Sequence, residues 1–197
     1  NDLAVGSHTA EHSGAVDLYE NLSGAGVFKW RARYKGLGAV NAIEVVDIME
    51  DSNRDLDIVV GVSDGPLSGK AHVWLQNETG FGRPSGTATY PETPASPDYS
   101  WNTGGEVLTL EAAQINEDVY PDLFAGTRSS SFYQGDLLLA ISGDYNNGVI
   151  KLNTGIMGEA AALDLADFNK DGRLDVVAGT RVSFSLGKVV VFYNESQ

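Results

Sequence analysis

Residues 167–175 place oxygen-bearing side chains at alternate positions around a turn. The candidate ligands are Asp167, Asn169 and Asp171 at positions 1, 3 and 5, the backbone carbonyl of Arg173, and Asp175. Gly172, at position 6, permits a sharp turn between them. Hard oxygen ligands in this number suit Ca²⁺, which takes six to eight of them, whereas zinc prefers His and Cys. The spacing therefore predicts a calcium loop.

This loop begins like a helix-loop-helix calcium site but departs from it. Such a site needs a bidentate Glu at position 12, and that position holds Ala178. Residues 174–180, which overlap the end of the loop, are rich in apolar and β-branched residues, which favours a strand. We therefore expect a calcium turn between two strands. A hairpin turn rich in Asp and Asn, without metal, is the alternative.

Two further segments match the loop less completely. The candidate ligands in residues 114–122 are Asn116, Asp118, Tyr120 and Asp122, with Gln114 at position 1 and Val119 in place of the glycine. The candidates in residues 49–57 are Asp51, Asn53, Asp55 and Asp57. A two-residue insertion there would give the first position to Asp47. Both segments could bind calcium, and a metal-free turn remains open for the first of them.

The loops belong to a repeat that runs along the chain. Residues 51–63, 116–128 and 169–181 align, and residues 2–7 match the second half of the same pattern. Apolar β-rich segments broken by Gly, Asn and Asp surround each copy, and we expect all of them, including the alanine-rich segment 158–166, to be strands. The repeat units cover approximately residues 1–35, 36–92, 102–153 and 154–197.

Four strands in each repeat unit predict an all-β fold, a β-propeller of four-stranded blades. The chain holds strands two to four of a first unit, two complete units, and strands one to three of a last. This makes about three and a half blades, fewer than the usual 4–8. We therefore expect a piece of a larger protein, or a ring completed by another copy or another chain. A β-sandwich is the alternative.

Composition excludes several functions. The 197 residues include 27 acids and 13 bases, a net charge of −14, which disfavours binding to nucleic acid or anionic lipid. No apolar run is long enough for a membrane span, and there are no cysteines for disulfides or thiolate chemistry. No nucleophile elbow, phosphate loop or metalloprotease helix occurs, so we predict that the chain is not an enzyme.

An insert between strands could carry binding. Residues 87–101 break the repeat and contain Tyr90, Tyr99 and Trp101, whose rings could stack on a sugar. Alternatively, these rings pack the insert onto the neighbouring sheet.

The 167–175 loop, the strand that follows it and the Asn-x-x-Gly turns near Asn21 and Asn77 resemble the FG-GAP/VCBS repeats. These are calcium-dependent propeller blades of integrin α-subunits and many secreted proteins. The resemblance implies that Ca²⁺ braces the turns and that other loops bind a protein or glycan. It also implies a recognition or adhesion module that is secreted or displayed on the cell surface. An accessory domain of a secreted polysaccharide-acting enzyme, or a self-assembling structural unit, is the alternative.

Overall fold

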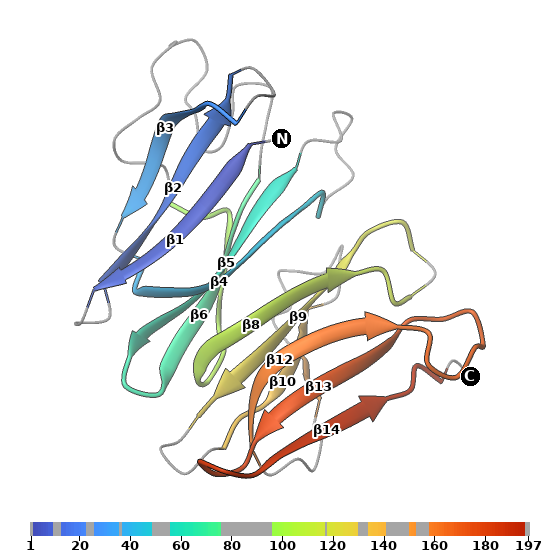
Figure 1. The fold of residues 1–197 in the computed structure, drawn as a ribbon. Coiled ribbons are helices and arrows are strands. Elements are labelled where there is room, and N and C mark those ends of the chain that lie inside the picture. Colours follow the sequence, from blue (N-terminus) through green and yellow to red (C-terminus); the bar gives the residue numbers. More distant parts are fainter. Residues whose placement is uncertain are drawn as a thin grey trace.

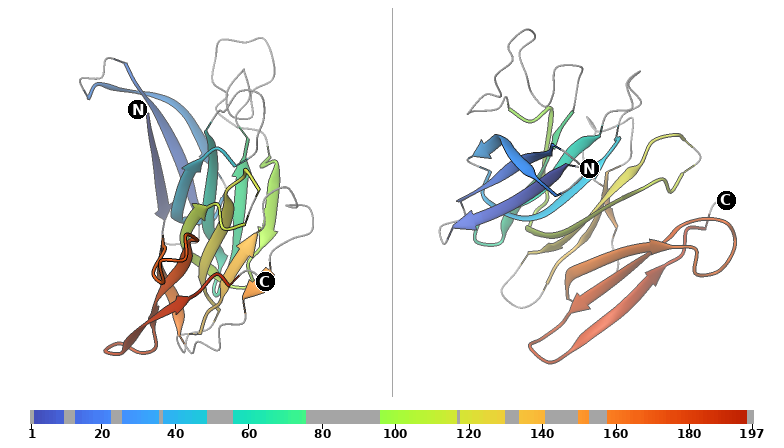
Figure 2. Two further views of the ribbon diagram at one scale, coloured as in Figure 1. Left: turned by 90° about the vertical axis from the view of Figure 1, so that its right-hand side faces the viewer. Right: turned by 45° about the horizontal axis from the view of Figure 1, so that its top comes forward.

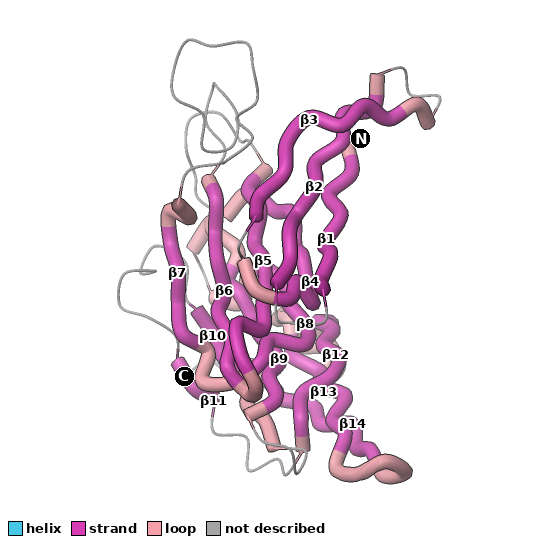
Figure 3. Tube along the Cα trace, turned by 90° about the vertical axis from the view of Figure 1, so that its left-hand side faces the viewer, coloured by secondary structure: helices cyan, strands magenta, loops and turns pink. Residues whose placement is uncertain are grey.

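The computed structural model describes ten stretches of the chain: residues 2–9, 13–22, 26–35, 37–48, 56–75, 96–116, 118–129, 134–140, 150–152 and 158–195. Within them lie fourteen strands, β1 to β14, and no helix (Figure 3). No described helix could therefore cross a membrane. The prediction of an all-β fold is confirmed.

The strands form four antiparallel sheets that follow one another in chain order. Sheet 1 contains β1 (Leu3–Thr9), β2 (Ser13–Asn21) and β3 (Phe28–Lys35). Sheet 2 contains β4 (Ala39–Val46), β5 (Asp57–Gly65), β6 (Ser68–Trp74) and β7 (Tyr99–Asn102). Sheet 3 contains β8 (Glu106–Ala113), β9 (Asp122–Arg128), β10 (Leu137–Ala140) and β11 (Ile150–Leu152). Sheet 4 contains β12 (Glu159–Ala166), β13 (Asp175–Arg181) and β14 (Gly187–Phe192).

Consecutive sheets pack face to face, from sheet 1 at one end of the molecule to sheet 4 at the other (Figures 1 and 2). Each junction holds its own apolar cluster. Val16 and Tyr34 of sheet 1 pack with Val60 of sheet 2, and similar clusters join sheets 2 and 3 and sheets 3 and 4. The strands β5 and β9 lie between neighbours on both sides, and their side chains are almost all buried. This explains why their sequences are nearly continuous apolar runs.

The sequence repeat is also a repeat of register. In sheets 2, 3 and 4 the first strand carries a bulge at the same place, at Asn41, Leu108 and Ala161. Directly after each bulge the first strand pairs with a glycine of the second strand, Gly61, Gly126 or Gly179. The copies aligned from sequence therefore occupy equivalent positions in three sheets. The alanine-rich segment 158–166 is the strand β12, as expected.

The fourth strand of sheet 2 extends the second unit beyond the expected boundary at residue 92. It is β7, which pairs with β6 through Ala71 and Trp101 and begins inside the predicted insert. Tyr99 and Trp101 point toward the sheet core while Ser100 and Asn102 are exposed, the alternation of a half-buried strand. Residues 76–95, which include the first part of the predicted insert, lie outside the described residues.

Candidate calcium site

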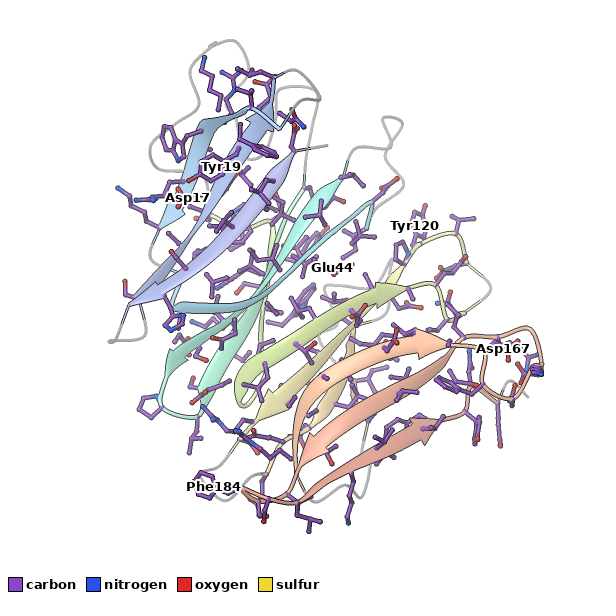
Figure 4. All side chains as sticks on the ribbon, in the orientation of Figure 1. Asp17, Tyr19, Glu44, Tyr120, Asp167 and Phe184 are labelled. Atoms are coloured by element: carbon purple, nitrogen blue, oxygen red, sulfur yellow. The ribbon has the colours of Figure 1, made fainter. Side chains whose placement is uncertain are left out.

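The 167–175 loop connects the end of β12 to the start of β13 (Figure 4, label Asp167). Asp167 accepts hydrogen bonds from the backbone N–H of Asp171, at 3.1 Å, and of Gly172, at 2.9 Å, one with each carboxylate oxygen. Asn169 Oδ1 also accepts from the Asp171 N–H, at 2.9 Å. The side chains at positions 1, 3 and 5 therefore gather around the same short piece of backbone, as their spacing predicts.

Two residues of this loop have left-handed backbone. Gly172 has φ of 90°, which a glycine adopts without steric cost, and Lys170 has φ of 64°, which is uncommon for a residue with a side chain. The side-chain bonds from positions 1, 3 and 5 hold this conformation. Residues 168–173 are exposed, so an ion could reach the loop from solvent.

Asp171 accepts two hydrogen bonds within the loop. Its Oδ2 accepts a hydrogen bond from Asn169 Nδ2 and its Oδ1 accepts one from the Arg173 N–H, both at 2.9 Å. These two bonds, the Asn169 bond first, hold the pKa of the Asp171 carboxyl below its ordinary value. The group is therefore ionised at neutral pH, as a calcium ligand must be.

Asp175 has a different position and a different set of partners. Its side chain is fully buried. One carboxylate oxygen accepts the Phe168 N–H and the other accepts the Asn194 N–H, both at 2.9 Å. Asp175 thus ties the entrance of the loop to the end of β14. We call this pair of hydrogen bonds the backbone bracket. It explains the aspartate without a metal, and the role of Asp175 as the closing calcium ligand stays a prediction.

The same bracket recurs at the other anchoring aspartates. Asp57 accepts the Ile48 N–H at 3.0 Å, and Asp122 accepts the Ile115 N–H at 3.3 Å. Both side chains are buried. Asp2 of sheet 1 accepts the N–H of Asn21 at 2.9 Å, the counterpart of the bond from Asn194 to Asp175. The recurrence of aspartate at the start of each second strand therefore has a backbone-binding cause.

The 114–122 loop repeats part of the arrangement. Asn116 accepts the Asp118 N–H at 3.0 Å, and Asp118 accepts the Tyr120 N–H at 2.9 Å, as Asn169 and Asp171 do in their loop. Gln114 holds the place of Asp167 and is exposed. Positions 3 and 5 are thus preserved, while the carboxylate at position 1 is absent.

Strand register decides which residue begins the loop between β4 and β5. Val46 pairs with Asp57 just as Ala166 pairs with Asp175, so Asp47 is the equivalent of Asp167. The alignment with a two-residue insertion is therefore the correct one. The other candidates in this loop, Asp51, Asn53 and Asp55, lie outside the described residues.

The donor atoms of the 167–175 loop are oxygen atoms, which suit a hard cation. Among the described residues, no three His, Cys, Asp or Glu side chains gather into a metal-binding group. In the 167–175 loop the ligand at position 3, Asn169, is an amide and not a carboxylate, and Asp175 points to backbone N–H groups. Asp167, Asn169 and Asp171 nevertheless supply hard oxygen atoms, which keep lone pairs beyond those used by the loop N–H groups. This partial set fits Ca²⁺ better than zinc.

Two of the three aromatic residues proposed for ligand binding, Tyr99 and Trp101, pack at the junction of sheets 2 and 3 instead. Trp101 is 7% exposed and belongs to the cluster between sheets 2 and 3. Tyr99 stacks on it, with ring centroids 6.2 Å apart and planes 5° from parallel. The buried Trp101 ring offers no free face to a sugar, so packing, the alternative reading, holds for this pair. Tyr90 lies outside the described residues.

The structure brings together a row of acidic residues that the sequence motifs did not predict. Glu44, Glu111 and Asp164 lie at one register position, two residues before the end of β4, β8 and β12 (Figure 4, label Glu44). Burial, and then repulsion by Glu111, raises the pKa of Glu44. Burial, and then repulsion by Asp164, raises the pKa of Glu111. Their common position relative to the anchoring aspartates was the available signal.

Comparison with models of known protein families gives no match, and a search among curated proteins gives no significant match.

Proposed function

We propose that this chain is a calcium-stabilised, propeller-type repeat module of the FG-GAP/VCBS kind, and that it acts outside the cell in recognition or adhesion. The observation that carries the proposal is the 167–175 loop. There the side chains of Asp167, Asn169 and Asp171 gather at the exposed end of sheet 4.

Calcium has a structural role in this proposal. Asp167 and Asp171 bring two negative charges close together in a loop whose Lys170 backbone is left-handed. A divalent cation would neutralise these charges and hold the turn that leads into β13. No catalytic step is assigned to it.

The proposed place of action follows from the expected affinity. Calcium sites of extracellular modules have dissociation constants of roughly 10⁻⁴–10⁻³ M, and exposed loops with few charges belong to this class. Millimolar calcium occurs outside the cell. A protein or glycan partner would then bind to loops other than those that hold the ion, because the calcium turns are occupied in bracing the sheets.

Titration calorimetry of the whole chain with Ca²⁺ and, separately, Mg²⁺ tests the proposal. We expect calcium to bind with a dissociation constant of roughly 10⁻⁴–10⁻³ M and magnesium to bind more weakly, because it retains its water. At ten times the dissociation constant, bound calcium should stabilise the fold by about 1.4 kcal/mol. Asp171→Asn should weaken calcium binding at least tenfold.

Glu20→Gln is the matched control, because it removes one carboxylate from sheet 1, where Glu20 pairs with Arg31. It should leave the calcium affinity unchanged. Asp118→Asn measures the contribution of the less complete loop, and we expect a smaller effect than that of Asp171→Asn. If neither calorimetry nor thermal melting responds to millimolar calcium, the proposal is wrong.

A further inference from the structure

One face of sheet 4 has no neighbouring sheet within the described residues, although the equivalent faces of sheets 1, 2 and 3 are covered. The comparison is clearest at the residue that pairs with the glycine of each second strand. These residues are Val16, Ala71, Leu137 and Val189. The first three are each 1% exposed, whereas Val189 is 74% exposed.

The glycines themselves show how a neighbour is accepted. A Cβ atom added at Gly6 would lie 2.5 Å from Val40 Cγ1 of the next sheet, and one at Gly61 would lie 2.4 Å from Val107 Cγ1. At Gly126 it would lie 2.6 Å from the carbonyl oxygen of Ala160. Each second strand therefore needs glycine because the first strand of the next sheet lies against it.

Gly179 is the fourth member of this series, and it lacks this contact. A Cβ atom there would have Ala162 Cβ of its own sheet as its nearest neighbour, at 3.5 Å, an ordinary contact. Gly179, Val189 and Ala162 also line a surface depression on the uncovered face. The sequence thus keeps a glycine at a position where sheet 4 alone does not require one.

Glycines of the third strands show the same difference between sheet 4 and the preceding sheets. A Cβ atom at Gly14 or Gly69 would meet the backbone oxygen of Gly38 or Gly105, at 2.3 and 2.6 Å, where the first strand of the next sheet begins. The equivalent residue of sheet 4, Gly187, meets only Thr180 of its own sheet.

A strand that covers sheet 4 would also have to match the charge on this face. The first strands of sheets 3 and 4 begin with Glu106 and Glu159, and each glutamate reaches back to the preceding sheet. Glu106 accepts the Leu67 N–H of sheet 2 at 3.1 Å, and Glu159 lies 3.9 Å from Arg128 of sheet 3. Arg181 of sheet 4 is the register equivalent of Arg128 and lines the uncovered depression.

We propose that the uncovered face of sheet 4 is the docking surface for one further sheet of the same repeat, whose first strand begins Gly–Glu. That strand would lie over Gly179 and Val189, and its glutamate would pair with Arg181. The inference rests on the repeat architecture of the proposed function but does not depend on calcium.

A second copy of this chain does not offer such a strand. Its Gly105–Glu106 and Gly158–Glu159 segments are already packed on sheets 2 and 3, and its uncovered sheet 1 begins with β1. β1 corresponds to a second strand, because its Gly6 pairs with Val16 as Gly61 pairs with Ala71. The occupant is therefore a different sheet of stated sequence chemistry.

The probe is a longer chain in which residues 143–197 are repeated after Gln197, so that a second Gly158–Glu159 strand follows sheet 4. The chain has no cysteines, so Val189→Cys in the first sheet 4 provides a unique label site. In chelator, we expect this thiol to react with a maleimide at least tenfold more slowly in the longer chain than in the original chain. Val119→Cys, at a position that is 68% exposed, should react equally in both.

Gly179→Ala separates docking from folding. A Cβ atom fits at this position in the original chain, so the Gly179→Ala variant, which adds only that atom, should melt like the unchanged original chain. It should nevertheless restore fast labelling at position 189 in the longer chain. Equal labelling of Val189→Cys in the two chains overturns the proposal. It is also overturned if the original chain protects position 189 by self-association at high concentration, since the occupant is then a second copy. Neither result bears on calcium binding, which is measured separately.

Discussion

A substitution at Asp175 can tell whether this residue acts as an acceptor for backbone N–H groups or as a metal ligand. Replacing it with asparagine keeps the shape and removes the charge. Its two carboxylate oxygens accept two backbone N–H groups, from Phe168 and Asn194, in a fully buried position. Asparagine has one acceptor oxygen, so one of these bonds is lost and its NH₂ group faces the N–H that has lost its acceptor.

The expected loss in the free energy of unfolding follows from those two hydrogen bonds. A hydrogen bond to a charged group contributes about 1.5–3 kcal/mol, and a buried donor left without an acceptor costs about 1–3 kcal/mol. We therefore expect Asp175→Asn to lower the free energy of unfolding by about 2–4 kcal/mol. With a urea slope of about 2 kcal/mol per M, the unfolding midpoint should fall by about 1–2 M.

The assay is urea unfolding followed by fluorescence, first in chelator and then in millimolar calcium. The bracket needs no ion, so the loss should appear in full in chelator. Asp171→Asn, at an exposed position, should leave the midpoint in chelator nearly unchanged and should lower it only in calcium. If Asp175→Asn has no effect in chelator and destabilises only in calcium, Asp175 is a ligand and the bracket argument is wrong.

Three other changes test the packing and the buried charges. Arg33 holds the pKa of Asp17 below its ordinary value of 3.8 through a bidentate ion pair. The ion pair stabilises the fold above pH 3.8, and this stabilisation is lost as pH falls through the lowered pKa of Asp17. Urea midpoints should therefore show that Asp17→Asn destabilises the protein at pH 7 and has a smaller effect near pH 3. The pKa of Glu44 is raised by burial and by Glu111, so ionisation costs stability as pH rises above its ordinary value of 4.5. Glu44→Gln should therefore raise the melting temperature at pH 7.5 and leave it unchanged at pH 4, and an equal shift at both would contradict this. Trp101→Ala should cost about 3–5 kcal/mol in urea unfolding because the ring is buried, and a cost below 1 kcal/mol would show that the ring is not part of the core.

Strand positions could be predicted because the necessary information is local. An apolar run such as residues 122–128, entered by aspartate and interrupted by glycine, specifies a buried strand whatever lies beside it. The order of ligands in the 167–175 loop is local too, since positions 1, 3 and 5 of a tight turn must face the same backbone. These features needed no knowledge of distant contacts.

Other features depend on which strands pair. Sequence left two alignments for the loop after β4, and the pairing of Val46 with Asp57 selected Asp47. Trp101 could equally have been an exposed ring in an insert, and its pairing with Ala71 placed it in the core. Propensity carries no information about either, because both depend on register between separate segments.

The sequence by itself determined the repeat, the all-β class and the three-residue oxygen set of the 167–175 loop, because each follows from periodicity and spacing along the chain. Only the tertiary structure decided that the anchoring aspartates bind backbone N–H groups, and that burial, with Glu111 nearby, raises the pKa of Glu44. Only the stacking of sheets shows that Gly179 repeats a contact surface which sheets 1 to 3 use and sheet 4 leaves uncovered. The physical reason is that burial and charge proximity are set between sheets, at distances that the order of residues does not specify.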